Sequence, residues 1–186
     1  GNASDMSGNG NHGMVNGATL GMDRHGRDNM AYSFDGVDQF IEVPDSHTLD
    51  IVGDIALSCW LKIPDGLSWQ HKPIAKRKAG GISTNYTFII RPDLNYRGAF
   101  GVGSTSVGDL RPQFVFTDNT VPIGTFFLMT GVYSDTRMST YINGILISFE
   151  TPTVTPIVNS SSLFIGCETG NGRFFNGLID DIRIYD

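Results

Sequence analysis

Oxygen-bearing side chains alternate along the first loop of the sequence, where they could bind a hard cation. Asp5, Ser7, Asn9 and Asn11 are separated by single residues, two of which are glycines. Calcium takes about six to eight oxygen ligands from carboxylates, amides and backbone carbonyls on loops. The alternative is that such side chains only satisfy backbone groups in turns. We predict a calcium site whose ligands are Asp5, Asn9, Asp35 and Asp180.

Aromatic residues next to amides and arginines form a second candidate set. A sugar needs a flat ring against its apolar face and polar partners for its hydroxyls. Trp69 is the strongest candidate because it follows Pro64-Asp65-Gly66, a loop-like stretch. The alternative is that these aromatic residues complete the rim of the core. The predicted ligand-binding residues are Trp69, Tyr86, Arg91, Tyr96, Glu168 and Arg173.

Patterns typical of enzymes are missing from the sequence. There is no Gly-x-Ser-x-Gly elbow and no phosphate-binding glycine loop. Asp180 and Asp181 are adjacent, so on a strand their side chains point to opposite faces and do not pair as a catalytic acid and nucleophile. The four histidines lie in polar sequence, and we expect exposed loop positions for them: His12, His25, His47 and His71. We therefore predict a protein without catalytic activity.

Composition narrows the classes of partner. The 186 residues carry a net charge of -6, and the 13 basic residues are scattered. The densest basic run, residues 72–78, is short, and we expect it to be a solvated loop rather than a nucleic-acid contact. No apolar run approaches the roughly 20 residues of a membrane-spanning helix. Cys59 and Cys167 lie in separate strand-like runs, where they either pair across the fold or stay as two small buried thiols.

The segments that must position these residues look like β-strands. Short runs of β-branched and aromatic residues are bounded by Gly, Asn, Asp and Pro, and no helical period is sustained. Asn143-Gly144 between two such runs predicts a type I′ hairpin. Strands without helices between them predict one all-β domain, residues 1–186. The expected strands are residues 31–34, 40–43, 55–63, 86–91, 98–102, 113–117, 126–133, 139–142, 145–149, 163–167 and 178–185.

Several phrases of the sequence, in a fixed order, resemble one family. They include Ala-Tyr-Ser-Phe-Asp-Gly-Val-Asp at 31–38, Ile-Ala-Leu-Ser-Cys-Trp-Leu-Lys at 55–62, and Asn-Gly-Leu-Ile-Asp-Asp-Ile-Arg-Ile-Tyr at 176–185. The ordered set is similar to laminin-G-like domains of the concanavalin A-like lectin/glucanase superfamily, which also resemble pentraxins. The sequence departs from the family in lacking a Trp-containing strand before the Ser-Gly-Asn-Gly-Asn loop.

The resemblance implies a jelly roll of two antiparallel sheets in a secreted or cell-surface protein that binds a glycan, often with calcium. A protein–protein adhesion module is the alternative function. A glycoside hydrolase or lyase is a third, and it would need Asp109, Glu150 or Glu168 to face another carboxylate, because the Glu-x-Asp-x-x-Glu strand of retaining glucanases is absent. The absent first strand predicts an open sheet edge, through which the monomer could form a weak homo-oligomer.

Overall fold

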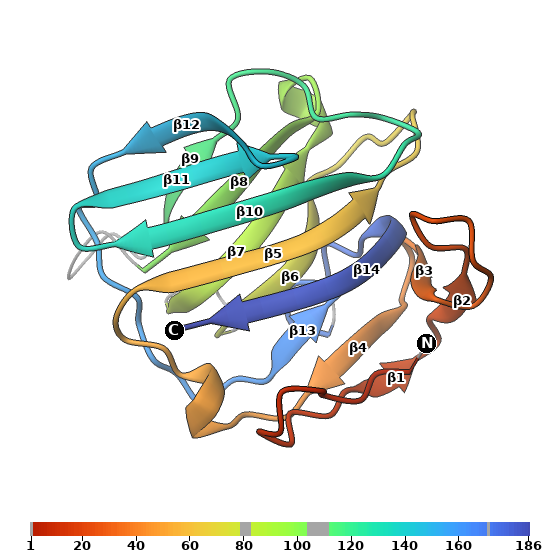
Figure 1. The fold of residues 1–186 in the computed structure, drawn as a ribbon, viewed down its shortest axis with the longest axis horizontal. Helices are drawn as coiled ribbons and strands as arrows, with labels where there is room; N and C mark the ends of the chain where they lie inside the picture. Colours follow the sequence, from red (N-terminus) through yellow and green to blue (C-terminus); the bar gives the residue numbers. More distant parts are fainter. Residues whose placement is uncertain (1, 79–82, 104–111, 171) are drawn as a thin grey trace.

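The protein is a sandwich of two antiparallel β-sheets (Figure 1). The computed structural model describes residues 2–78, 83–103, 112–170 and 172–186. These residues form fourteen strands, seven in each sheet, and two short 3-10 helices, η1 (His47–Leu49) and η2 (Pro92–Leu94). The all-β jelly-roll prediction is therefore confirmed.

Sheet A contains two of the predicted ligand-binding residues, Tyr86 and Arg91, both on β7. Its order is β1 (Met14–Asn16), β4 (Phe40–Val43), β13 (Leu163–Ile165), β6 (His71–Arg77), β7 (Thr84–Arg91), β8 (Arg97–Val102) and β9 (Gln113–Phe116).

Sheet B packs against it. Its order is β12 (Ile145–Glu150), β11 (Arg137–Ile142), β10 (Phe127–Ser134), β5 (Ile55–Lys62), β14 (Asn176–Tyr185), β3 (Ala31–Asp35) and β2 (Thr19–Gly21).

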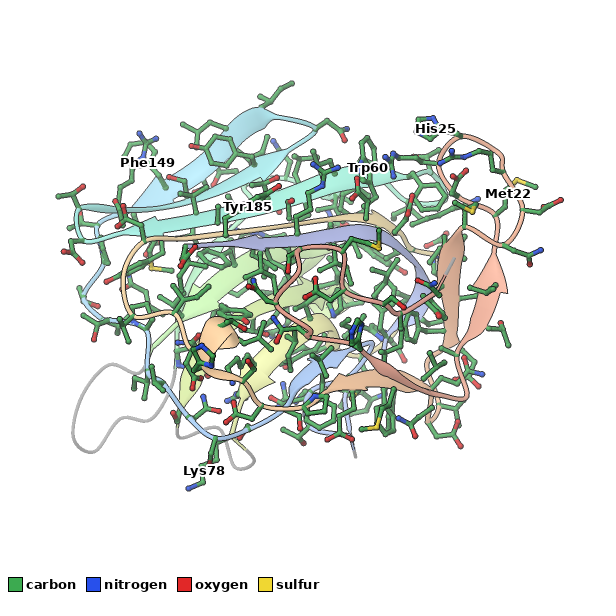
Figure 2. The ribbon with its side chains drawn as sticks, turned by 60° about the horizontal axis from the view of Figure 1, so that its bottom comes forward. Met22, His25, Trp60, Lys78, Phe149 and Tyr185 are labelled. Atoms are coloured by element: carbon green, nitrogen blue, oxygen red, sulfur yellow. The ribbon has the colours of Figure 1, made fainter. Side chains whose placement is uncertain are left out.

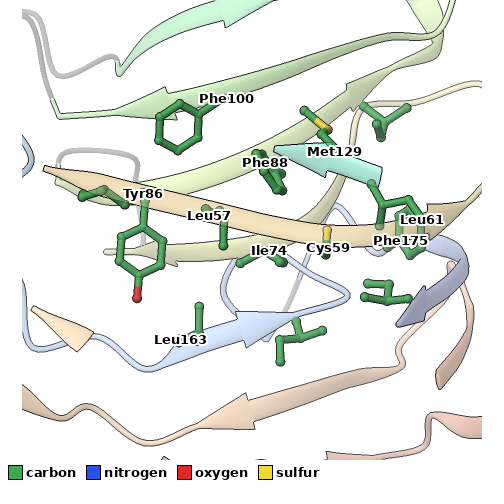
Figure 3. Close-up of a cluster of buried hydrophobic side chains, with 14 of the residues drawn as sticks. Leu57, Cys59, Leu61, Ile74, Tyr86, Phe88, Phe100, Met129, Leu163 and Phe175 are labelled. Atoms are coloured by element: carbon green, nitrogen blue, oxygen red, sulfur yellow. The ribbon is translucent and has the colours of Figure 1, made fainter. Parts of the chain in front are cut away.

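Alternation along the central strands builds the core between the sheets. On β5, Ile55, Leu57, Cys59 and Leu61 are fully buried, while the residues between them are partly exposed. This is the period of two expected of a strand with one face on a core. Figure 3 shows the cysteine among the aliphatic and aromatic side chains of both sheets.

Both cysteines are free and buried, which decides between the two alternatives for them. Burial raises the pKa of the Cys59 thiol far above its ordinary range, and raises that of Cys167 to about 11. Both thiols are therefore held protonated and act as small apolar side chains.

The hairpin prediction is confirmed. Asn143 and Gly144 have φ angles of 52° and 77° and join β11 to β12. Only residues that tolerate positive φ fit both central positions of such a turn.

The expectation of a solvated loop at residues 72–78 is wrong, because most of this run forms strand β6. Every residue of β6 is buried. Lys76 is completely buried, and its Nζ lies 2.6 Å from a carboxylate oxygen of Asp45 and 3.1 Å from one of Asp50. It also donates to the carbonyl of Ser161 at 2.9 Å. Paired charges with long aliphatic stems can occupy a position that hydropathy alone assigns to solvent.

Tyr86 is fully buried, so its prediction as a ligand-binding residue is wrong. It lies on β7, seven of whose eight residues are buried, and its hydroxyl donates to the carbonyl of Leu49 at 3.3 Å. The ring packs in the core, as the alternative for the aromatic residues held.

Close contact between the sheets at Gly131 gives a stability test. A Cβ at this position of β10 would lie 2.2 Å from Cγ of Phe100, a fully buried ring on the opposite sheet. Overpacking of this kind costs about 1–3 kcal/mol or more. Gly131→Ala should lower the free energy of unfolding by at least that much in urea denaturation. Gly53→Ala is the control, because nothing lies within 4 Å of its Cβ. Equal stability of the two variants would contradict the packing described.

Candidate functional site

A cleft of about 400 Å³ lies at one end of the sandwich. Its walls come from the turn after β3, the loop between β5 and β6, and the segment before β14, which meet at the right of Figure 1. The register explains the meeting, because Asn176 at the start of β14 pairs with Asp35 at the end of β3. Three segments far apart in sequence thus form one concave surface.

Trp69 stands at this cleft with 79% of its surface exposed, more than any other aromatic side chain in the described part of the chain. Gln70, Arg173, Asn176 and Asp35 line the same hollow. The set combines an exposed flat ring with amide, guanidinium and carboxylate groups. An apolar ring beside a few convergent polar groups is the usual composition of a small-molecule site.

Tyr96 holds the loop that carries Trp69. Its hydroxyl accepts the backbone N–H of Leu67 at 2.7 Å and donates to a carboxylate oxygen of Asp65 at 3.3 Å. Gly66, with φ of 79°, makes the turn between these two contacts. Tyr96 was predicted to touch a ligand, but its hydroxyl is used by the loop and it is not among the residues lining the cleft.

Glu168 orients Arg173 on the opposite wall. One carboxylate oxygen of Glu168 lies 2.8 Å from Nε of Arg173. The other contacts Arg77 and lies 3.3 Å from Nζ of Lys72. Burial, with the nearby charges of Arg77 and Arg173, holds the pKa of Lys72 well below its usual range. Glu168 thus holds the guanidinium of Arg173 at the cleft, while Lys72 and Arg77 are buried behind it.

His71 closes the inner end of the cleft and was expected in an exposed loop. That expectation is wrong, because it begins β6 and is only 8% exposed. Its Nδ1 lies 2.6 Å from the carbonyl oxygen of Phe174, which makes it the donor, and its buried Nε2 has no hydrogen-bond partner among the described residues. The ring presents an unused acceptor next to the cleft.

Arg91 does not reach the cleft. It forms a two-point pair with Asp93 in η2, at 2.8 Å and 2.6 Å, at the end of β7. Of the six predicted ligand residues, the structure brings Trp69 and Arg173 together at the cleft and puts Glu168 directly behind Arg173. Asn176 was not predicted as a ligand residue; the pairing of β14 with β3 places it opposite Asp35 and next to Gly36.

The four predicted calcium ligands do not form one site. Asp35 lines the Trp69 cleft, whereas Asp5, Asn9 and Asp180 line a different hollow. Asp180 is paired with Arg24 at 2.5 Å, and Asp5 accepts from the backbone N–H groups of Ser7 and Asn11. The described residues contain no cluster of three or more His, Cys, Asp and Glu suited to a metal. Calcium binding stays a prediction.

The acids named for a hydrolase have no catalytic partner in the described contacts. Glu168 faces Lys72, Arg77 and Arg173. Glu150, on β12, accepts from the side-chain amide of Gln113 at 3.3 Å. Asp109 lies outside the described residues.

Residues 35–186 match the sequence profile of the Laminin_G_3 family, the concanavalin A-like lectin/glucanases superfamily. The chain belongs to this superfamily. No curated protein matches the sequence. Among the described residues, no helix is long and apolar enough to cross a membrane.

Solved structures share the fold at low sequence identity. The botulinum neurotoxin serotype D binding domain superposes with a TM-score of 0.73 at 15% identity, over 98% of this lectin-like chain and 45% of that one. The binding domain of Paraclostridial Mosquitocidal Protein 1 gives 0.74 at 16%, over 98% and 45%. Domain 4 of AbnA, an extracellular arabinanase from Geobacillus stearothermophilus, gives 0.68 at 18%, over 100% and 87%. The chain thus spans less than half of the toxin binding domains.

His71 gives the site a testable pH dependence. Burial lowers the pKa of its imidazole below the ordinary value of about 6.5, against the opposing effect of the Phe174 carbonyl. Below about pH 6.5 the unfolded chain takes up a proton that the folded chain resists, so the free energy of unfolding falls as the pH drops toward the folded pKa.

His71→Gln should remove this pH-dependent part of the free energy of unfolding. The difference in unfolding free energy between wild type and variant, measured by urea denaturation from about pH 8 to pH 5, should shrink as the pH falls. A difference that does not change with pH would show that the imidazole is not held neutral by the fold.

Proposed function

We propose that this chain is a non-catalytic module of an extracellular protein, and that it binds a carbohydrate at the Trp69 cleft. The observation that carries the proposal is the exposed indole of Trp69 beside Gln70, Arg173 and Asn176. Two structural neighbours support it by their ligands: the AbnA domain was solved with arabinotriose, and the binding domain of botulinum neurotoxin DC with SialylT.

In this proposal the sugar lays its apolar face on Trp69. Arg173 and the amides of Gln70 and Asn176 donate to ring hydroxyls, and Asp35 accepts from them. A volume of about 400 Å³ is near the lower end for small-molecule sites, so the cleft takes one or two sugar residues at the end of a glycan. Glu168 fixes Arg173 before binding, which reduces the entropy lost when the sugar is held.

A protein–protein adhesion module is the second candidate. The edge strand β12 exposes Phe149 (60%), Ile145 (67%) and Leu146 (39%), and Figure 2 shows Phe149 projecting from the surface. Apolar side chains on an unpaired edge can pair with another protein. This surface lies on the edge of sheet B opposite β2. Substitutions on β12 can therefore be tested independently of substitutions at the cleft.

A glycan array, followed by calorimetry with each hit, tests the proposal. Trp69→Ala should weaken binding by about tenfold or more, since a central stacked aromatic usually contributes over 1 kcal/mol. Phe149→Ala is the matched control, an exposed aromatic on the far edge, and should bind as the wild type does. Binding lost in the Phe149 variant but kept in the Trp69 variant would favour the adhesion module. Silence across a broad array would contradict carbohydrate binding.

Tyr96→Phe tests how the indole is positioned. Removing the hydroxyl leaves the N–H of Leu67 without its acceptor, and the loop loses its contact with Asp65. We expect about three- to tenfold weaker binding of the same glycan. The double variant with Trp69→Ala should be no weaker than Trp69→Ala alone, because both changes act through one ring. Additive losses would show that Tyr96 acts on the ligand by another route.

A further inference from the structure

His71, at the inner end of the cleft, has one ring nitrogen in use and one without a partner. Its Nδ1 donates to the carbonyl of Phe174 at 2.6 Å, because a carbonyl oxygen only accepts. In the neutral ring Nε2 is then an acceptor, and no described residue donates to it. The residue lines the cleft although it is only 8% exposed. A buried acceptor without a donor is rare in folded proteins, and a bound ligand can supply the missing donor.

Two hydrogen bonds tie the start of β6 to the segment that carries Arg173. The backbone N–H of Lys72 donates to the carbonyl of Arg173 at 3.2 Å, and the next carbonyl, of Phe174, accepts from the His71 ring. Arg173 has a φ of 55°, in the left-handed region that residues with a side chain seldom adopt. Such strain persists only where the surroundings fix it, and it is common at ligand sites. The imidazole and the guanidinium are thus brought to the cleft by residues that bond to each other directly.

The charged groups around the cleft do not favour an anion. Arg173 and Asp35 are the charged residues among those that line it. Arg173 is already paired with Glu168, whereas Asp35 has no ion pair among the described contacts. Lys72 is held by Glu168 behind the wall, and Asp65 accepts from a backbone N–H of its own loop. An acidic sugar would therefore bring its carboxylate close to that of Asp35, in a protein whose net charge is -6.

We propose that the cleft selects a neutral sugar, with a hydroxyl that donates to Nε2 of His71 and accepts from the guanidinium of Arg173. The inference rests on the proposed binding of carbohydrate beside Trp69 and names the class of sugar. A hydroxyl suits this position because it is both a donor and an acceptor. A carboxylate or a sulfate only accepts, so it would leave Nε2 without a donor. The contact of Arg173 with Glu168 uses Nε, and the guanidinium carries further N–H donors for the sugar.

The His71 ring gives this contact a pH dependence. Protonation turns Nε2 into a donor, which no longer accepts from a sugar hydroxyl. None of the charged groups named above forms an ion pair with the ring in the described contacts, and on its core side the ring meets the uncharged Phe175. Burial lowers the pKa of His71 below its ordinary value of about 6.5, so the ring is neutral at pH 7. Below the folded pKa, affinity should fall by up to about tenfold for each pH unit.

Matched neutral and acidic sugars test the selection. The pairs are galactose with galacturonic acid, glucose with glucuronic acid, and lactose with sialyllactose, and arabinotriose is a further neutral probe. Binding measured by calorimetry at about pH 7.5, where the ring is neutral, should be confined to the neutral probes. Trp69→Ala should weaken it by about tenfold or more. The pKa of His71, followed by NMR, should fall when a neutral probe binds, and the affinity should decline below that pKa.

Two substitutions of His71 separate the acceptor from the rest of the ring. His71→Gln can place a side-chain oxygen near the position of Nε2 and does not titrate, so it should keep most of the affinity and lose the pH dependence. His71→Asn reaches only the position of Nδ1, where it can still donate to Phe174, and it should bind about tenfold more weakly. His47→Asn, at an exposed histidine outside the cleft, is the control and should bind as the wild type does.

The outcomes distinguish this inference from the proposed function. Silence across the glycan array and all these probes, or binding that Trp69→Ala leaves unchanged, would overturn both. Binding that needs Trp69 would overturn this inference alone if it prefers the acidic member of a pair, persists below the pKa of His71, or is unchanged in His71→Asn. The paired sugars and the pH profile use the wild-type protein, so they decide the question even if His71→Asn does not fold.

Discussion

The carboxylate of Glu168 contacts two basic side chains that strand β6 carries into the protein, and the cleft depends on this interaction. Lys72 is 1% exposed and Arg77 9%, and a buried cation without a partner is costly. The segment after β13 must therefore fold back over β6 so that Glu168 reaches both side chains. The same carboxylate holds Arg173. The contact of Glu168 with β6 therefore also places the guanidinium of Arg173 at the cleft.

The segments that cover sheet A determine where on the protein a ligand can bind. At the other end of β6, Lys76 needs Asp45 and Asp50, which draws the η1 region onto the sheet. With β6 and most of β7 buried on both faces, the broad face of this sheet is not available to a ligand. Recognition is left to the ends and edges of the sandwich, where loops and unpaired strands are exposed.

The sequence predicted those elements whose local pattern agrees with their environment. The alternation of β5 and the Asn143-Gly144 turn are local signals, and both are confirmed. Strand β6 was missed because its lysines and proline oppose a buried strand, and only distant carboxylates make it possible. Strands β1 and β2 were missed because three exposed residues carry no period.

The site was predicted in part for the same reason. Trp69 could be found because its loop context is local. Whether Tyr86 or Tyr96 faces solvent depends on which loops cover β7 and where the hydroxyl finds a partner, and neither is encoded nearby in the sequence. The grouping of the acidic residues failed because turns of similar composition line different hollows: Asp35 lines the Trp69 cleft, and Asp5 lines the hollow that also contains Asp180.

Strand β14 connects the two hollows, yet their chemistries are separate. Asn176 begins the strand and lines the cleft. Its backbone is paired with β3, so a ligand there can contact only side chains. Arg183 lies near its end, beside the hollow of about 660 Å³ that Asp5 and Asp180 also line. Seven residues of strand place these positions roughly 20 Å apart. Effects at such a separation usually add, because residues more than about 7–10 Å apart without shared partners are seldom coupled. A change at the larger hollow should therefore leave the cleft unaltered, because β3 and β14 are paired between them.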